Sequence, residues 1–128
     1  MKCRVYLRIV ESKFDLHEFG ALISPWVGGR VRAFRFKEGP PIESPVSYWT
    51  SDEIEVSDGR PEEKLLGLLT AFDVGIRQLS LSPMPISAVV AIEHLSDEEI
   101  PGLYLSRELI GLLATLCGDL DVDYAYQL

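Results

Sequence analysis

Residues 3–10, Cys-Arg-Val-Tyr-Leu-Arg-Ile-Val, decide how this chain folds, because apolar and polar side chains alternate along them. The alternation defines two sets: Cys3, Val5, Leu7 and Ile9 on one side, and Arg4, Tyr6 and Arg8 on the other. A period of two is typical of a half-buried β-strand. The pattern therefore predicts a sheet with one face on a hydrophobic core and the other face carrying charged and aromatic groups.

Three helices are expected between the strands. Asp15 caps the first, with Glu18 three residues later as in a capping box, and Pro25 ends it. Pro61 suits the first position of the second helix, and Gly75 interrupts or ends it. Each helix has an apolar stripe: Leu16, Phe19, Leu22 and Ile23, then Leu65, Leu68, Leu69 and Phe72, then Leu109, Leu112, Leu113 and Leu116. The third helix is capped by Ser106 and stopped by Gly118.

Four further strands complete the pattern. Residues 30–37 form a strand if a β-bulge near Ala33 restores its alternation, and residues 46–51 pair with it as a long hairpin. Residues 86–94 are apolar on both sides, as in a central strand. Residues 119–126 form the last strand, with three aspartates on one face.

The order of these elements predicts an α+β fold in a single domain, residues 1–128. The first six elements fit a ferredoxin-like βαββαβ core, to which an αβ unit is added. We expect a mostly antiparallel sheet of about five strands, with helices on one face only.

The charge of the chain bears on its partners. The 128 residues have a net charge of −8, which argues against nucleic acid as a ligand. Residues 1–50 hold eight Lys and Arg against five Asp and Glu, a net of +3. Residues 51–128 hold four against fifteen, a net of −11, and this acidity favours a basic protein as partner.

The compartment is predicted from what the sequence does not contain. Two cysteines are too few for a disulfide framework, and Arg4 and Arg8 interrupt any apolar leader. No segment has the roughly 20 apolar residues of a membrane helix. We expect a cytoplasmic protein that contacts no membrane and holds no cofactor.

The aspartates at positions 119, 121 and 123 are one candidate site. Carboxylate oxygens are the ligands that Mg²⁺ and Ca²⁺ prefer, so Asp119, Asp121 and Asp123 are the candidate metal ligands. A row along one strand, however, points its carboxylates in parallel rather than toward one point. The alternative is a solvated face that pairs across strands with Arg4 and Arg8.

A second candidate site is a surface for a partner. Arg30, Arg32, Arg35 and Lys37 would form a basic row on the second strand, which can equally be a solvated face. Tyr and Trp are frequent at the centres of interfaces, although a tryptophan can also simply cover the sheet. The candidate partner-binding residues are Trp49, Tyr48, Arg32, Arg35, Asp52 and Glu53.

The last third of the chain resembles a known family. Tyr104-Leu-Ser-Arg-Glu-Leu-Ile110, Leu112-Leu113 and Leu120-Asp-Val-Asp-Tyr124 are similar to the closing signature of a family of small bacterial domains of unknown function, family 4279. The opening strand, Trp49 before a polar turn and the Leu-rich second helix follow in a similar order. The resemblance implies a small α+β cytoplasmic domain, and it assigns no chemistry because the family has no established activity.

Three functions fit these patterns. The first is a non-enzymatic protein-binding module, for which an acidic immunity or inhibitor protein is one example, since no catalytic motif is present. The second is a small-ligand-binding or regulatory ferredoxin-like domain that acts as a homodimer. The third is a divalent-metal-dependent enzyme built on the Asp119, Asp121 and Asp123 row.

Overall fold

The computed structural model describes residues 2–10, 15–33, 47–56, 60–81, 86–95 and 103–127 of the chain. They form three helices and a six-stranded sheet, in an α+β arrangement. The elements in chain order are β1 (Lys2–Ile9), α1 (Leu16–Ile23), β2 (Gly29–Ala33), β3 (Ser47–Ser51), β4 (Ile54–Val56), α2 (Pro61–Gln78), β5 (Ser87–Leu95), α3 (Arg107–Leu116) and β6 (Asp119–Gln127).

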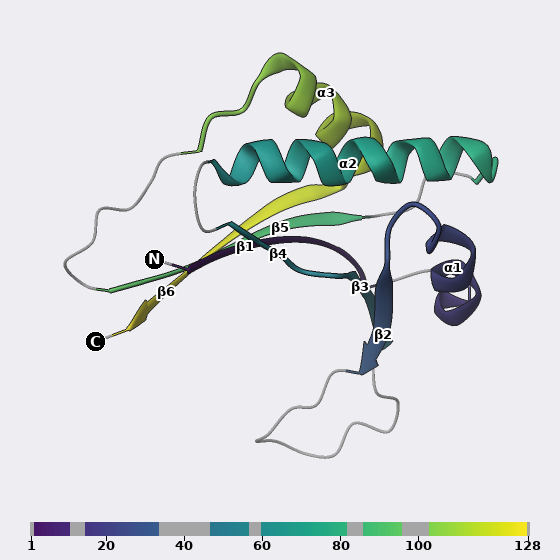
Figure 1. Cartoon of the computed structure of the whole chain (residues 1–128), viewed down its shortest axis with the longest axis horizontal. Helices are drawn as coiled ribbons and strands as arrows, with labels where there is room; N and C mark the ends of the chain where they lie inside the picture. Colours follow the sequence, from purple (N-terminus) through teal and green to yellow (C-terminus); the bar gives the residue numbers. More distant parts are fainter. Residues whose placement is uncertain are drawn as a thin grey trace.

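The sheet is open, mixed and mostly antiparallel. Its strands lie in the order β2-β3-β1-β5-β6, and β4 pairs with β1 beyond the end of β3 (Figure 1). The pairs β1–β3, β1–β4, β1–β5 and β2–β3 are antiparallel, whereas β5 and β6 are parallel. A parallel pair needs a crossover connection, and α3 supplies it between β5 and β6.

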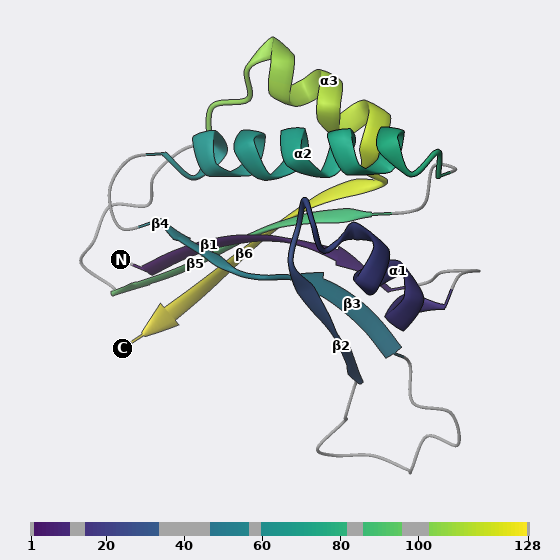
Figure 2. The same ribbon diagram turned by 45° about the vertical axis from the view of Figure 1, so that its right-hand side comes forward.

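The helices pack on one side of the sheet. Figures 1 and 2 show α2 and α3 over β1, β5 and β6, while α1 lies beside β2 and β3 where these strands bend away from the rest. The predicted helix caps are confirmed: Asp15 accepts hydrogen bonds from the backbone N–H groups of His17 and Glu18, and Ser106 accepts one from Leu109.

Three aromatic side chains in the core join α1, β3 and α2. Trp49 on β3 is fully buried, and its ring meets that of Phe19 edge-on at 5.3 Å between centroids. Phe72 on α2 lies 6.4 Å from Trp49 and 6.2 Å from Phe19. Because aromatic rings bury the most area per side chain, this trio fixes α1 and α2 against the bent end of the sheet.

A β-bulge separates β3 from β4, which both pair with β1. Arg8 lies opposite Thr50 and Val5 lies opposite Ile54, so two residues of β1 face the three residues 51–53. The Ser51 hydroxyl fills the gap by accepting a hydrogen bond of 2.8 Å from the Leu7 backbone N–H. Because of the bulge, β3 and β4 both pair with β1, but the register of β4 on β1 is shifted by one residue from that of β3.

Several expectations need correction. The segment after residue 51 was predicted as a polar loop, but Ile54 and Val56 alternate toward the core and form β4, so the sheet has six strands rather than about five. A bulge is present at 51–53. β2 pairs with β3 without interruption from Gly29 to Ala33, and the predicted bulge is not tested beyond Ala33. The stretch 34–46 lies outside the described residues.

Two helix predictions were also wrong. Leu22 is 44% exposed although it was placed in the apolar stripe of the first helix. Gly75 does not interrupt the second helix, which continues without a break to Gln78. The absence of a side chain at Gly75 lets Ile23 and Trp26 pack against the helix, since a Cβ there would lie 2.6 Å from Ile23 Cδ1 and 3.2 Å from Trp26 Cβ.

The close approach of β2 to Trp49 predicts that Gly29 tolerates no side chain. A Cβ on Gly29 would lie 2.5 Å from both the Thr50 carbonyl oxygen and Trp49 Cζ2. We expect Gly29→Ala to lower the free energy of unfolding by about 1–3 kcal/mol, measured by urea denaturation. Gly67→Ala is the control, because nothing lies within 4 Å of that helical position, and it should raise stability by about 1 kcal/mol. Equal effects would contradict this account.

The hydroxyl in the bulge predicts a second effect on stability. Ser51→Ala leaves the buried Leu7 N–H without its acceptor, and we expect a loss of about 1–3 kcal/mol together with faster hydrogen exchange of the Leu7 amide. Ser24→Ala removes an exposed hydroxyl bonded to the Ala21 carbonyl, and should change stability by less than about 0.5 kcal/mol. An unchanged Leu7 exchange rate would show that the bulge does not depend on Ser51.

Candidate functional site: the open face of the sheet

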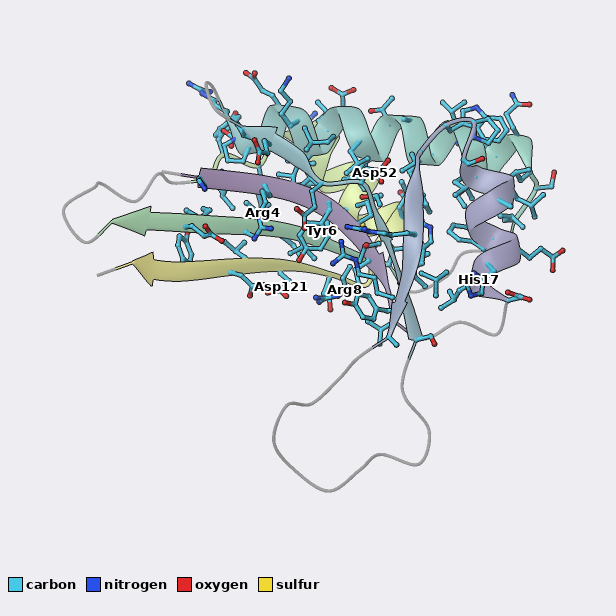
Figure 3. All side chains as sticks on the ribbon, turned by 60° about the horizontal axis from the view of Figure 1, so that its bottom comes forward. Arg4, Tyr6, Arg8, His17, Asp52 and Asp121 are labelled. Carbon is cyan, nitrogen blue, oxygen red and sulfur yellow. The ribbon has the colours of Figure 1, made fainter. Side chains whose placement is uncertain are left out.

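The face of the sheet opposite the helices is polar and charged. The alternation of β1 sends Arg4, Tyr6 and Arg8 to this face, and Figure 3 shows them projecting from it together with Asp121. None of the described helices covers it. We call it the open face; from the strand registers it also carries Arg30, Arg32, Tyr48, Thr50, Glu53, Glu55, Val89, Ala91, Glu93, Asp119 and Asp123.

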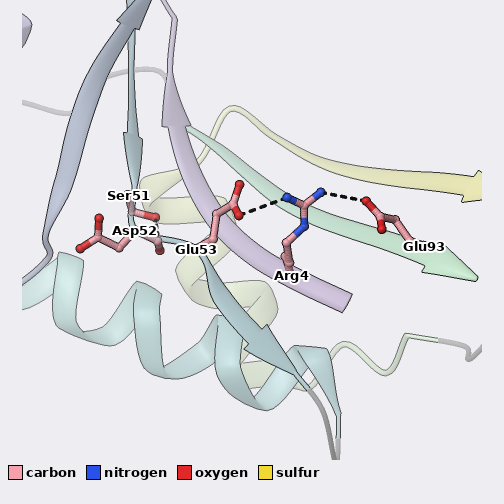
Figure 4. Close-up of polar contacts among 5 residues, drawn as sticks. All are labelled: Arg4, Ser51, Asp52, Glu53 and Glu93. Carbon is pink, nitrogen blue, oxygen red and sulfur yellow. Dashed lines mark hydrogen bonds and ion pairs between the residues drawn. The ribbon is translucent and has the colours of Figure 1, made fainter. Parts of the chain in front are cut away.

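Arg4 joins β1 to the residues on either side of it. Its Nη1 lies 3.1 Å from Glu53 Oε2 and its Nη2 lies 3.4 Å from Glu93 Oε1 (Figure 4). Burial lowers the pKa of the Arg4 guanidinium, but the hydrogen bond to Glu53 and the charges of Glu53 and Glu93 outweigh it and raise the pKa. Arg4 is thus compensated by two carboxylates and has no charge left over for a ligand.

Arg8 makes a longer connection, across β5 to β6. Its Nη2 lies 3.3 Å from Asp121 Oδ2. The predicted pairing of the aspartate row with arginines of β1 is therefore confirmed for Arg8. Arg4, the other expected partner of that row, turns to Glu53 and Glu93 instead, because these lie on or beside the strands that flank it.

A shallow pocket lies between these ion pairs and the bent end of the sheet. It has a volume of about 120 Å³ and is lined by Tyr6, Arg8, Arg32, Tyr48, Thr50 and Glu53. Burial raises the pKa of the Tyr6 phenol, although the charge of Arg8 opposes the shift. Tyr6 is therefore a neutral hydroxyl at physiological pH, available for hydrogen bonding to a bound group.

The arginine side chains at this pocket are incompletely satisfied. Arg8 Nε and Arg32 Nε are both buried, and neither donates a hydrogen bond within the described residues. A buried donor without an acceptor costs about 1–3 kcal/mol, so an acceptor on a bound molecule would stabilise either group.

The other candidate residues lie elsewhere. Trp49 was a candidate for partner contact, but it is fully buried and belongs to the core, which leaves it no surface for a partner. Asp52 is exposed beside Gly28, whose carbonyl accepts a hydrogen bond from the Asp52 N–H at 2.8 Å. Arg35 lies outside the described residues, so Tyr48, Arg32 and Glu53 are the candidates that the pocket brings together.

The aspartate row does not gather as metal ligands. In the described part of the chain, no three His, Cys, Asp or Glu side chains meet in a way that could hold a metal ion. Asp121 is held by Arg8, and the row points its carboxylates outward from one strand. The metal-site hypothesis for Asp119, Asp121 and Asp123 therefore has no geometric support here.

The cysteines are poor nucleophiles. Burial raises the pKa of the Cys117 thiol to about 11, with a further contribution from the charge of Asp119. Burial also raises the pKa of Cys3, with Glu62 adding to it. Both thiols are protonated at neutral pH, whereas thiol chemistry requires the thiolate.

Sequence reasoning named Tyr6 as an aromatic residue suited to binding but did not include the two arginines of β1 among the partner-binding candidates. The alternation of residues 3–10 did place Arg4, Tyr6 and Arg8 on one face, and that signal was sufficient to include them. What it could not show is that the bend of the sheet brings Arg32 and Tyr48 from the hairpin beside Tyr6 and Arg8.

Comparisons with protein-family models, curated proteins and solved structures find no match for this chain. The resemblance of residues 104–124 to the bacterial domain family therefore stays a prediction. In the described residues, no helix has the length and apolar character needed to cross a bilayer.

The aspartate row predicts a pH-dependent stability. Burial and the neighbouring Asp121 raise the pKa of Asp123, with Arg8 opposing them. A raised pKa in the folded state means that the charged form of Asp123 destabilises the fold, so the contribution of this residue to stability increases as pH falls through the range where it takes up its proton.

We therefore expect Asp123→Asn to raise the melting temperature at pH 7, because it removes the repulsion with Asp121. The gain should shrink at pH 3, where carboxylates are largely protonated. Thermal unfolding followed by circular dichroism at both pH values measures the difference. A gain of the same size at pH 3, or a loss at pH 7, would contradict the prediction.

Proposed function

We propose that this chain is a non-enzymatic protein-binding module and that its open face is the binding surface. The observation that carries the proposal is a polar sheet face, organised by ion pairs and uncovered by the described helices, with a pocket between two arginines and two tyrosines. Tyrosine and arginine are enriched where binding energy concentrates in protein interfaces.

The charge distribution supports a basic partner. The chain has a net charge of −8, and carboxylates form the margins of the open face: Glu53 and Glu55 at one side and Asp119, Asp121 and Asp123 at the other. Charges at the rim of an interface steer association more than they strengthen the complex. This charge distribution fits an acidic inhibitor or immunity-type protein that acts on a basic enzyme. We propose that the protein is located in the cytoplasm.

The finer description of the fold belongs to the same proposal. We take β1, α1, β2, β3, α2 and β5 as a ferredoxin-like core, to which α3 and β6 are added. The order β5-β1-β3-β2, antiparallel throughout, supports this. The separate strand β4 and the bend at β2 and β3 depart from a regular ferredoxin-like sheet.

A small-ligand-binding domain is the second candidate, and the pocket is the observation that favours it. A homodimer remains compatible with either candidate and is read from light scattering.

Partner capture from a lysate of the source organism tests the proposal. The bait pair is the wild-type chain and the double variant Asp119→Lys/Asp123→Lys, which reverses two exposed charges of the open face. We expect a basic protein to be retained by wild type and lost from the variant. Raising the ionic strength from roughly 0.1 M to 1 M should weaken capture as well, because the Debye length falls from about 10 Å to about 3 Å.

A matched variant separates the open face from net charge alone. Glu63→Lys/Glu108→Lys makes the same change in charge at exposed positions of α2 and α3, in the helical layer, and it should retain the partner. If both variants lose the partner equally, or if no protein is captured above background, the open face is not the binding surface that we propose.

A further inference from the structure

We propose that the pocket between β1, β2 and β3 binds a carboxylate group, held between the guanidinium groups of Arg8 and Arg32. This inference deepens the proposed function by naming the chemical group that the open face recognises. It rests on the proposed function only in that both concern the open face. The carboxylate can belong to an acidic side chain of a protein partner or to a free small acid.

The donors at the pocket carry the first part of the argument. Arg8 and Arg32 come from strands that are not neighbours in the sheet, yet both line the same pocket. Each has a buried Nε–H that meets no acceptor in the described residues. A guanidinium pairs best with a carboxylate through two parallel hydrogen bonds, one of which commonly uses Nε. A carboxylate that accepts from these groups requires both guanidinium groups to turn toward the pocket, because their Nε atoms are shielded from solvent.

The balance of charge indicates a monoanion. Arg8 is paired with Asp121, and Glu53 shares the charge of Arg4 with Glu93. Arg32 has no ion pair among the described residues and leaves one positive charge at the pocket. A single carboxylate neutralises that charge, whereas a phosphate dianion would add a second negative charge beside Glu53.

The size and the lining of the pocket agree with a small group. Its volume of about 120 Å³ is well above the ~10–15 Å³ that admits one water molecule. The side chains of Tyr6 and Tyr48 form part of the wall, and Thr50 contributes a hydroxyl. Tyrosine rings present flat, apolar surfaces with a hydroxyl at the tip, which suits a carboxylate attached to a short aliphatic chain.

Nuclear magnetic resonance of the arginine side chains tests the inference directly. The Nε–H signals of Arg8 and Arg32 are followed in the intact chain while acetate is added at constant ionic strength, with chloride as the replaced anion. We expect saturable shifts of both signals. Arg32→Gln should weaken acetate binding at least tenfold, and Arg32→Lys should also weaken it, because lysine keeps the charge but loses the two-pronged geometry.

Arg30→Gln is the matched control. Arg30 lies on the same strand and the same face, is exposed and does not line the pocket. It removes the same charge, so acetate binding should change by less than twofold. Backbone amide spectra of each variant establish that the fold is retained, and Arg32→Lys keeps the inference testable if Arg32→Gln does not fold.

Two further probes identify the source of the group. A capped Gly-Glu-Gly peptide that binds more tightly than acetate indicates a side chain of a partner, whereas acetate binding with no peptide binding indicates a free small acid. The inference is overturned if the wild-type signals do not shift, if Arg32→Gln and Arg30→Gln weaken binding equally, or if inorganic phosphate binds in preference to acetate. No partner is present in this titration, so its failure leaves the capture experiment on the protein-binding module unaffected, and the reverse also holds.

Discussion

The structure depends on strand β1 satisfying two environments at once. Its backbone is hydrogen-bonded on both sides, to β5 along nearly its whole length and to β3 and β4 on the other side. Cys3, Val5, Leu7 and Ile9 are buried under the helices, while the residues between them reach the open face. Because side chains alternate along a strand, a shift of one residue would exchange the two faces and place arginines in the core. The core and the candidate site are therefore fixed by the same register.

The bulge at residues 51–53 maintains that register although the segment from β3 to β4 has one residue more than the part of β1 that it faces. One extra residue in the polar turn lets β4 resume pairing with Val56 and Ile54 toward the core. The same turn brings Glu53 within reach of Arg4 and into the wall of the pocket. Bulges are common beside functional sites because they redirect one side chain without breaking the sheet. Here the redirected side chain is an acid that sets the charge of the pocket.

The ion pairs of the open face contribute little to folding. Their side chains are 24–37% exposed, and pairs of this kind are worth about 0–1 kcal/mol each. The aromatic cluster of Phe19, Trp49 and Phe72 and the aliphatic core hold the fold together. The arrangement of charges on the open face is therefore not dictated by the stability of the fold.

The sequence by itself determined the local elements. Alternation in residues 3–10, the caps at Asp15 and Ser106 and the apolar strand at 86–94 each depend on neighbours within a few positions, and the structure agrees with all of them. It also identified Arg32, Tyr48 and Glu53 as candidates, though together with Trp49, whose burial depends on contacts with α1 and α2 far along the chain. Only the tertiary structure decided that Tyr6 and Arg8 join those three residues in one pocket. That outcome follows from strand order and from the bend of β2 and β3, which arise from packing between segments distant in sequence and leave no signal in local periodicity.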